Sequence, residues 1–197
     1  MTPFTVVTGP AVALNRANVD TDLIIPARFL RKPRSAGYQN FLFHDLRRAE
    51  ADFPLNGIDP VVLVADANFG CGSSREGAVY ALVDAGIRCV IAPSFGDIFA
   101  GNAGKNGLLT IVLPPDQAAA LRNQLPAEVS VDLPRQRLRF PDGHEHVFEM
   151  DPFRKRCLVE GLDDIGLTLE HTARIAAFQE ADRHARPWAQ PDGTEAP

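Results

Sequence analysis

Short apolar runs alternate with segments of helical character through the middle of the chain. VVLV at residues 61–64 is β-branched and uninterrupted, which is typical of a buried strand. IRCVIA at 87–92 and LLTIVL at 108–113 have the same character. Between these runs, REGAVYALVDAG at 75–86 and SFGDIFAGNAGKNG at 94–107 predict helices. Strands and helices that alternate at this spacing predict βαβ units and a parallel sheet.

The second half of the chain mixes helices with a ribbon. DQAAALRNQL at 116–125 follows two prolines and favours a helix by residue propensity. VSVDLPRQRLRF at 129–140 alternates apolar with polar positions and contains turn residues, so it predicts a β-ribbon that continues through HVFEM. DPFRKRCLVEG at 151–161 and TARIAAFQEAD at 172–182 again have helical character. The pattern as a whole predicts an α/β fold.

Length and composition fit one folded body. The 197 residues are 45% hydrophobic and 23% charged, which is ordinary globular composition. This length is sufficient for one hydrophobic core. The last twelve residues, RPWAQPDGTEAP, contain three prolines and little that can be buried. We therefore expect a single domain over residues 1–180 and a flexible tail over residues 181–197.

Charge and cysteine content exclude several classes of protein. The net charge of −5 gives no reason to expect nucleic acid as a partner. The first residues lack a basic segment followed by an apolar run, and no window of 18 residues is apolar, so we expect a cytoplasmic protein that does not bind membranes. Cys71, Cys89 and Cys157 are too few and too widely spaced for a disulfide framework, a zinc site or an iron–sulfur cluster held by this chain alone.

The turn NFGCGSSREG at residues 68–77 is the best candidate for chemistry. Ser73 and Glu76 fit an S-x-x-E capping box, which predicts that Ser73 begins the helix. A lone serine there would be a simple cap, but with two adjacent serines one is free to face a ligand. A helix N-terminus favours anions, and Arg75 can hold a carboxylate through two parallel hydrogen bonds. The turn therefore indicates a carboxylate substrate.

A serine in this position can also act as a base. Negative charge on its oxygen would be stabilised by the helix N-terminus, the arginine and the glycine amides, so it could remove a proton from the carbon beside a carboxylate. The turn does not match the G-x-S-x-G pattern of serine hydrolases, and it lacks the third glycine of the dinucleotide-binding pattern. We interpret Cys71 as a small residue packed under the turn rather than a nucleophile.

The first third of the chain is less regular. The segment at residues 17–48 carries two aspartates around Thr21, the apolar run LIIP, and four cations within residues 28–34. A charged segment beside an apolar run indicates either a solvent-exposed loop or the rim of a binding site.

Five segments in this order resemble one known family, the small subunits of 3-isopropylmalate dehydratase. They span most of the chain up to about residue 180. The segments are NVDTDLIIPARFL (18–30), NFGCGSSRE (68–76), VIAPSFGDIF (90–99), KNGLL (105–109) and GLDDIGLTLEH (161–171).

The resemblance implies a fold and a partner. Small subunits of this family are the swivelling domain of the aconitase superfamily, a compact β/β/α unit with a mainly parallel central sheet flanked by helices. It implies a hydro-lyase of leucine biosynthesis that isomerises 2-isopropylmalate and 3-isopropylmalate by dehydration and rehydration. The chain would act only with a large subunit, as a heterodimer or heterotetramer, and that subunit would hold the [4Fe-4S] cluster.

The resemblance also implies roles for individual residues. Ser73 would be the base that removes and returns the carbon-bound proton, while the iron of the cluster activates the departing hydroxyl. Ser74 and Arg75 would hold the substrate carboxylate. A supporting role falls to Gly72 and to the D-T-D segment Asp20, Thr21 and Asp22, for which a purely structural turn is the alternative.

Four positions depart from the family pattern. After the serines, Gly77, Val79 and Tyr80 stand where the family has histidine, proline and tryptophan. In the loop KPRSAGYQ, Ser35 stands where an arginine is common, and the adjacent Arg34 is a candidate to bind substrate in its place. Tolerated drift is one explanation. The alternatives are a related hydratase for methylmalate/citraconate, dimethylmalate or homoaconitate, and a non-catalytic dicarboxylate-binding paralogue.

Overall fold

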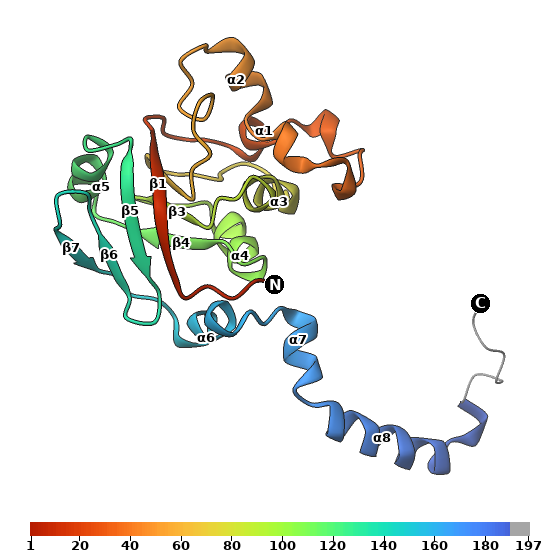
Figure 1. The fold of residues 1–197 in the computed structure, drawn as a ribbon. Coiled ribbons are helices and arrows are strands. Elements are labelled where there is room, and N and C mark those ends of the chain that lie inside the picture. Colours follow the sequence, from red (N-terminus) through yellow and green to blue (C-terminus); the bar gives the residue numbers. More distant parts are fainter. Residues whose placement is uncertain (190–197) are drawn as a thin grey trace. The chain divides into compact units, whose positions relative to one another are not determined.

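A seven-stranded sheet organises most of the residues that the computed structural model describes, 1–189 (Figure 1). Its strand order is β4-β3-β2-β1-β5-β6-β7. The strands are β1 (Val6–Leu14), β2 (Val62–Ala65), β3 (Cys89–Ala92), β4 (Leu109–Val112), β5 (Ala127–Asp132), β6 (Arg137–Arg139) and β7 (Glu145–Val147).

Half of the sheet is parallel. β1, β2, β3 and β4 pair in parallel, with Ala11 opposite Val62 and Cys89 opposite Leu109. Every residue of β2 and β3 is buried, because helices cover both faces of these strands. The three predicted strands and their parallel arrangement are confirmed.

The other half of the sheet is antiparallel and contains the predicted ribbon. β5 pairs with β1, β6 with β5, and β7 with β6, all antiparallel. Along β5, Val129 and Val131 face the core while Glu128 and Ser130 do not, as the alternation predicted. The strand β1 was not predicted from the sequence. Gly9 and Pro10 are residues typical of a turn. The strand tolerates Pro10 because parallel pairing with β2 begins only at the next residue, Ala11.

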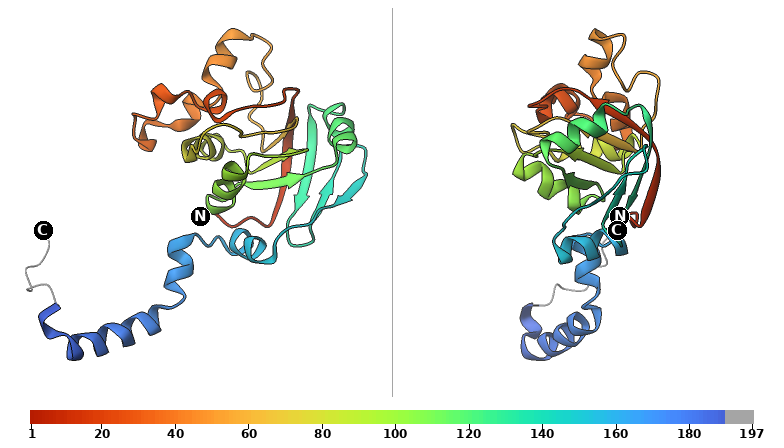
Figure 2. Two further views of the ribbon diagram at one scale, coloured as in Figure 1. Left: turned by 180° about the vertical axis from the view of Figure 1, so that it is seen from behind. Right: turned by 90° about the vertical axis from the view of Figure 1, so that its left-hand side faces the viewer.

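Helices divide the core into two layers. One layer packs α3 (Glu76–Asp84) and α4 (Asp97–Lys105) on the sheet, together with α1 (Thr21–Ile24) and α2 (His44–Ala49). The other layer packs α5 (Pro115–Arg122) and α6 (Pro152–Glu160) on the opposite face. Figure 2 shows α3 and α4 side by side and α5 at the far side of the sheet. Short 3₁₀ turns connect α1 to α2 at Ala27–Phe29, Arg34–Ala36 and Tyr38–Phe41.

The predicted capping box is wrong. The residue that caps α3 is Arg75, whose backbone is still extended (φ −120°, ψ 95°) and whose side chain makes no capping hydrogen bond. The helix therefore begins three residues after Ser73. The carboxylate of Glu76 does not reach back to the serine, because it accepts a 2.8 Å hydrogen bond from Asn106 Nδ2. Ser73 is thus not used as a cap.

A second unit begins at Asp163, after residues 1–162. It contains α7 (Asp164–Leu169), α8 (Thr172–Ala185) and a 3₁₀ turn at Pro187–Ala189. α8 thus covers the first five residues of the predicted tail, and residues 190–197 of that tail lie outside the described residues. One domain over 1–180 and a flexible tail stay predictions. No described helix has both the length and the apolar character needed to cross a membrane.

Gly70→Ala is expected to destabilise the fold by more than about 2 kcal/mol. Gly70 has φ +74°, and a Cβ atom there would lie 2.2 Å from Cγ of Phe99. Gly101→Ala is the matched control, since nothing lies within 4 Å of its added Cβ and alanine stabilises a helix interior by about 0.5–1 kcal/mol. Urea unfolding measures both. Equal stabilities for the two variants would contradict this account.

Candidate active site

Three turns meet at the carboxyl edge of the parallel strands. Because β1, β2 and β3 run in the same direction, the segments that follow them emerge on one side of the sheet, where α/β proteins bind ligands. The turn after β2, residues 68–75, is called the serine turn from here on. Gly70 N–H donates to Val19 C=O at 2.7 Å, and Gly96 N–H donates to Phe69 C=O at 2.9 Å. These bonds fix the serine turn between its two neighbours.

The glycine before the serines is required by the backbone. Gly72 has φ +90°, a conformation that L side chains rarely adopt. A Cβ atom there would also lie 3.3 Å from Cβ of Asp20. Gly72 therefore lets the serine turn pass close to the D-T-D segment, which gives it a structural part in the site.

Thr21 connects the D-T-D segment to the first serine. The residue is only 2% exposed. Thr21 Oγ1 donates to the carbonyl of Ser73 at 3.0 Å and lies 3.4 Å from Ser73 Oγ. Its backbone N–H donates to Cys71 C=O at 2.9 Å. The buried hydroxyl of Thr21 thus contacts Ser73 from the protein interior. Ser73 and Ser74 are themselves exposed.

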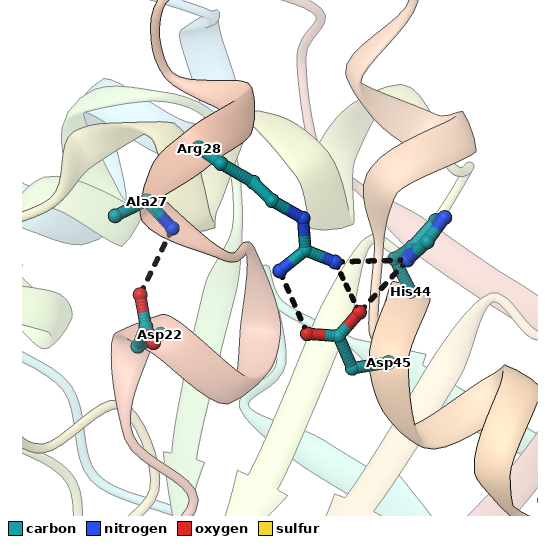
Figure 3. Close-up of polar contacts among 5 residues, drawn as sticks. All are labelled: Asp22, Ala27, Arg28, His44 and Asp45. Atoms are coloured by element: carbon teal, nitrogen blue, oxygen red, sulfur yellow. Dashed lines mark hydrogen bonds and ion pairs between the residues drawn. The ribbon is translucent and has the colours of Figure 1, made fainter.

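The two aspartates beside Thr21 do different things. Asp20 is the N-cap of α1, and its Oδ1 accepts from Leu23 N–H at 2.7 Å. Asp22 forms an ion pair with Arg75. Figure 3 shows its second contact, in which Oδ1 accepts from Ala27 N–H at 2.9 Å. The hydrogen bond from Arg75, followed by that from Ala27, lowers the pKa of the Asp22 carboxyl. The structure therefore brings Arg75 and the D-T-D segment together.

Arg34 contacts α3. Its Nε lies 3.1 Å from Oδ2 of Asp84, near the end of the helix, and its guanidinium lies 4.2 Å from the centre of the Tyr80 ring. The hydrogen bond with Asp84 raises the pKa of Arg34. Among the described residues, its contacts are thus with the helix and not with the serine turn.

Two of the departures from the family pattern, Gly77 and Tyr80, lie in one contact region. A Cβ atom on Gly77 would lie 2.6 Å from Leu30 Cδ2 and 3.4 Å from the ring of Tyr38. The ring of Tyr38 also packs against that of Tyr80, at 6.4 Å between centroids. Leu30 and Tyr38 therefore occupy the space that a larger side chain at position 77 would need. No local sequence pattern indicates that these positions are neighbours.

A second ion pair, between Arg28 and Asp45, holds the segment that follows α1. Arg28 Nη1 donates to Asp45 Oδ2 at 2.9 Å, and His44 Nδ1 lies 2.9 Å from the other oxygen of Asp45 (Figure 3). Arg28, followed by His44, lowers the pKa of the Asp45 carboxyl. The rings of Phe29 and Phe41 stack at 4.4 Å. This cluster was not identified from the sequence, because its members are spread over 18 residues without a motif.

The described residues do not offer a ligand set for an iron–sulfur cluster. No three of their histidines, cysteines or acidic residues gather where a metal ion could be held. Cys71 is half-buried in the serine turn, whereas Cys89 and Cys157 are buried. Burial raises the pKa of the Cys89 thiol, which opposes the thiolate form that a metal requires.

Asp22→Asn is expected to lower stability at pH 7 by less than about 1 kcal/mol, because the pair with Arg75 is partly exposed. The folded-state pKa of Asp22 lies below its ordinary 3.8, so the carboxylate stabilises the fold above about pH 4 and loses that contribution as the pH falls through the folded value. Urea unfolding at pH 7 and pH 3 should show the variant and the wild type converging in acid. Asp59→Asn controls for the loss of one carboxylate, and an undiminished difference at pH 3 would disprove the assignment.

Comparison with known proteins places these features in a family. The model of the aconitase C-terminal domain matches residues 1–116, and the model of the C-terminal domain of the 3-isopropylmalate dehydratase small subunit matches residues 164–192. A 3-isopropylmalate dehydratase small subunit from Paramagnetospirillum magneticum is 50% identical over 95% of this chain and all of its own length. One from Rhodospirillum centenum is 49% identical over 96% of this chain and 99% of its own.

A solved structure agrees with the sequence comparisons. A 3-isopropylmalate dehydratase from Methanocaldococcus jannaschii is 28% identical to this chain and superposes with a TM-score of 0.70. The match covers 87% of this chain and 98% of that one. Both the fold and the sequence are shared along nearly the full length. The chain belongs to the family of 3-isopropylmalate dehydratase small subunits, built on the aconitase C-terminal domain.

Proposed function

We propose that this chain is the small subunit of a hydro-lyase that interconverts 2-isopropylmalate and 3-isopropylmalate in leucine biosynthesis. The observation that carries the proposal is the position of Ser73, which is exposed, not used as a helix cap, and supported by the buried hydroxyl of Thr21. Family membership, with relatives at about 50% identity, supports the same reaction.

Ser73 is the proposed base and acid. Transfer of a proton from the carbon beside a carboxylate to Ser73 Oγ, with loss of hydroxide from the adjacent carbon, breaks one C–H and one C–O bond and forms one C=C bond. Return of that proton to one carbon and addition of hydroxide to the other, in the opposite sense, gives the isomer. Negative charge on Ser73 Oγ is favoured by the N-terminus of α3, which begins at Glu76, and by the neighbouring Arg75.

Ser74, Arg75 and Arg34 are the proposed carboxylate-binding groups. A guanidinium has five N–H donors. Arg75 meets Asp22 through Nη1, and Arg34 meets Asp84 through Nε and Nη2, so each side chain has further donors for a substrate carboxylate. Gly72, Asp20, Thr21 and Asp22 hold the serine turn in place through the contacts described above.

The partner of the proposed enzyme is a large subunit that carries the [4Fe-4S] cluster. The described residues of this chain do not form a ligand set suited to such a cluster, so we assign the cluster to that partner. A heterodimer and a heterotetramer both remain compatible with the proposal, and the cytoplasmic location stays a prediction.

Isopropylmalate is favoured over the other acids. The relatives at about 50% identity are named 3-isopropylmalate dehydratase small subunits. The departures at Ser35, Gly77 and Tyr80 are the reason for considering methylmalate/citraconate, dimethylmalate and homoaconitate as alternative substrates. Leu30 and Tyr38 fill the space beside Gly77, so this departure is compensated within the chain. The non-catalytic alternative is disfavoured because the support of Ser73 by Thr21 is intact.

Ser73→Ala is expected to lower kcat for isopropylmalate by about 10²- to 10⁴-fold, the usual contribution of a general base. The assay is the ultraviolet absorbance of the unsaturated acid, with the full chain and its cluster-loaded large subunit. Circular dichroism and complex formation should be unchanged. Ser130→Ala, which removes a hydroxyl from β5, is the matched control. A Ser73→Ala enzyme with normal kcat would disprove the assignment.

Arg34→Ala is expected to raise KM for isopropylmalate by about 10- to 100-fold, in keeping with the loss of a charge-assisted hydrogen bond. Asp84→Ala removes the partner of Arg34 but leaves the guanidinium in place, so it should raise KM less. If the two variants and their double mutant give the same KM, Arg34 only anchors its segment on α3 and does not bind substrate.

A further inference from the structure

A hollow lies on the antiparallel half of the sheet, where β1, β5 and β6 run side by side (Figure 1). Residues of these strands line it, together with the hairpin that joins β6 to β7. Its volume is about 580 Å³, which is within the range of sites that bind small molecules. All of its lining residues belong to the unit of residues 1–162 and none to the serine turn, so the proposed reaction does not account for it.

The strand register places four polar side chains on one face of the sheet. Thr8 lies opposite Ser130, and Ser130 lies opposite Arg139. Glu128 is two residues before Ser130 on β5 and therefore points to the same side. Val129, between them, is buried in the core on the other side. All four polar residues line the hollow, on the face that points away from this core.

Two of these side chains carry opposite charges that are not neutralised by a neighbour. Among the described residues, the side chains of Arg139 and Glu128 form no hydrogen bond or ion pair. Glu145 lies directly opposite Arg139 on β7, but its carboxylate accepts from Arg137 at 2.6 Å. Glu128 and Arg139 are diagonal neighbours on adjacent strands, a spacing at which long side chains can reach a common ligand. An unpaired cation and an unpaired anion thus border the same hollow.

The remaining side chains of the hollow are either already bonded or apolar. Thr8 Oγ1 and Ser130 Oγ lie 2.7 Å apart, so these hydroxyls bond to one another. Ala127, Phe140 and Pro141 supply apolar surface and are called the apolar wall from here on. The charged groups open to a ligand are therefore those of Arg139 and Glu128.

Hydrogen bonds fix the hairpin that carries part of the apolar wall. Phe140 N–H donates to His144 C=O at 2.8 Å and closes the hairpin. Gln124, which follows α5, bonds to Asp142 twice. Gln124 Nε2 donates to Asp142 Oδ2 at 3.0 Å, and Asp142 N–H donates to Gln124 Oε1 at 3.2 Å. This side of the hollow is therefore held in place by the fold.

A guanidinium, a carboxylate and an apolar wall around one hollow are complementary to an α-amino acid. A guanidinium binds a carboxylate through two parallel hydrogen bonds, and a carboxylate accepts hydrogen bonds from an ammonium group. A simple anion would be repelled by Glu128 and a simple amine by Arg139, whereas a zwitterion satisfies both side chains.

We propose that this hollow binds a free α-amino acid with an apolar side chain. The carboxylate of the ligand binds Arg139, its ammonium group binds Glu128, and its side chain contacts the apolar wall. The proposal goes beyond the proposed function, because it involves neither the serine turn nor the reaction.

L-Leucine, 4-methylpentanoate and 3-methylbutylamine are the probes that test the proposal. They share a branched apolar chain, but 4-methylpentanoate lacks the ammonium group of L-leucine and 3-methylbutylamine lacks its carboxylate. Calorimetry with the full-length chain should give a Kd for L-leucine below about 1 mM. Either analogue should bind at least about tenfold more weakly, because it leaves one charged side chain without its partner.

Arg139→Gln and Glu128→Gln locate the binding. Each substitution should raise the Kd for L-leucine at least about tenfold, through the loss of charge-assisted hydrogen bonds. Both side chains are exposed, so the melting temperature should stay within a few degrees of the wild type. Arg48→Gln removes an exposed cation from α2 and is the matched control, for which Kd should change less than twofold.

The outcomes separate this proposal from the proposed function. Absence of L-leucine binding, or an unchanged Kd in both variants, overturns it. An analogue that binds as tightly as L-leucine would show a site for a single charge, and loss of L-leucine binding on addition of the large subunit would show a subunit interface. Each of these results also overturns it. Binding that follows Arg139 and Glu128, in an enzyme that never turns over isopropylmalate, would support the site and defeat the proposed function.

Discussion

The candidate site depends on a backbone contact, the hydrogen bond between Gly70 N–H and Val19 C=O. It ties the turn after β2 to the segment after β1, and the bonds between Phe69 and residues 94–96 tie it to the turn after β3. Only a glycine allows the chain to approach the ring of Phe99 so closely at this point. The positions of Ser73 and Arg75 therefore follow from main-chain geometry three to six residues earlier.

The other residues of the candidate site are held next to the serine turn by α1 and its contacts. Thr21 lies beneath Ser73, Asp22 lies beside Arg75, and α1 holds both because Asp20 caps its first turn. The segment that follows is held independently, by the Arg28–Asp45 pair and by the contact of Arg34 with α3.

Local patterns in the sequence predicted most of the fold but not the side-chain partners. The β-branched runs at β2, β3 and β4 and the alternation at β5 are signals within a few residues, and they identified those strands. The strand β1 was missed because Gly9 and Pro10 resemble a turn unless β5 is known to pair with them. The capping box failed because S-x-x-E spacing cannot reveal that Arg75 stays extended. The pairs Arg34–Asp84 and Arg75–Asp22 join residues about 50 positions apart, which no local pattern encodes.

The central position of β1 has a consequence for how the protein is made. β1 is the first strand to leave the ribosome, yet its two neighbours in the sheet come from residues 62–65 and 127–132. One edge of the strand can therefore pair once residues 62–65 are made, whereas the other waits for residues 127–132, and closing such a distant pairing is slow. An unpaired strand edge favours association with other chains, so this edge of β1 is an aggregation-prone feature of the nascent chain until β5 is available.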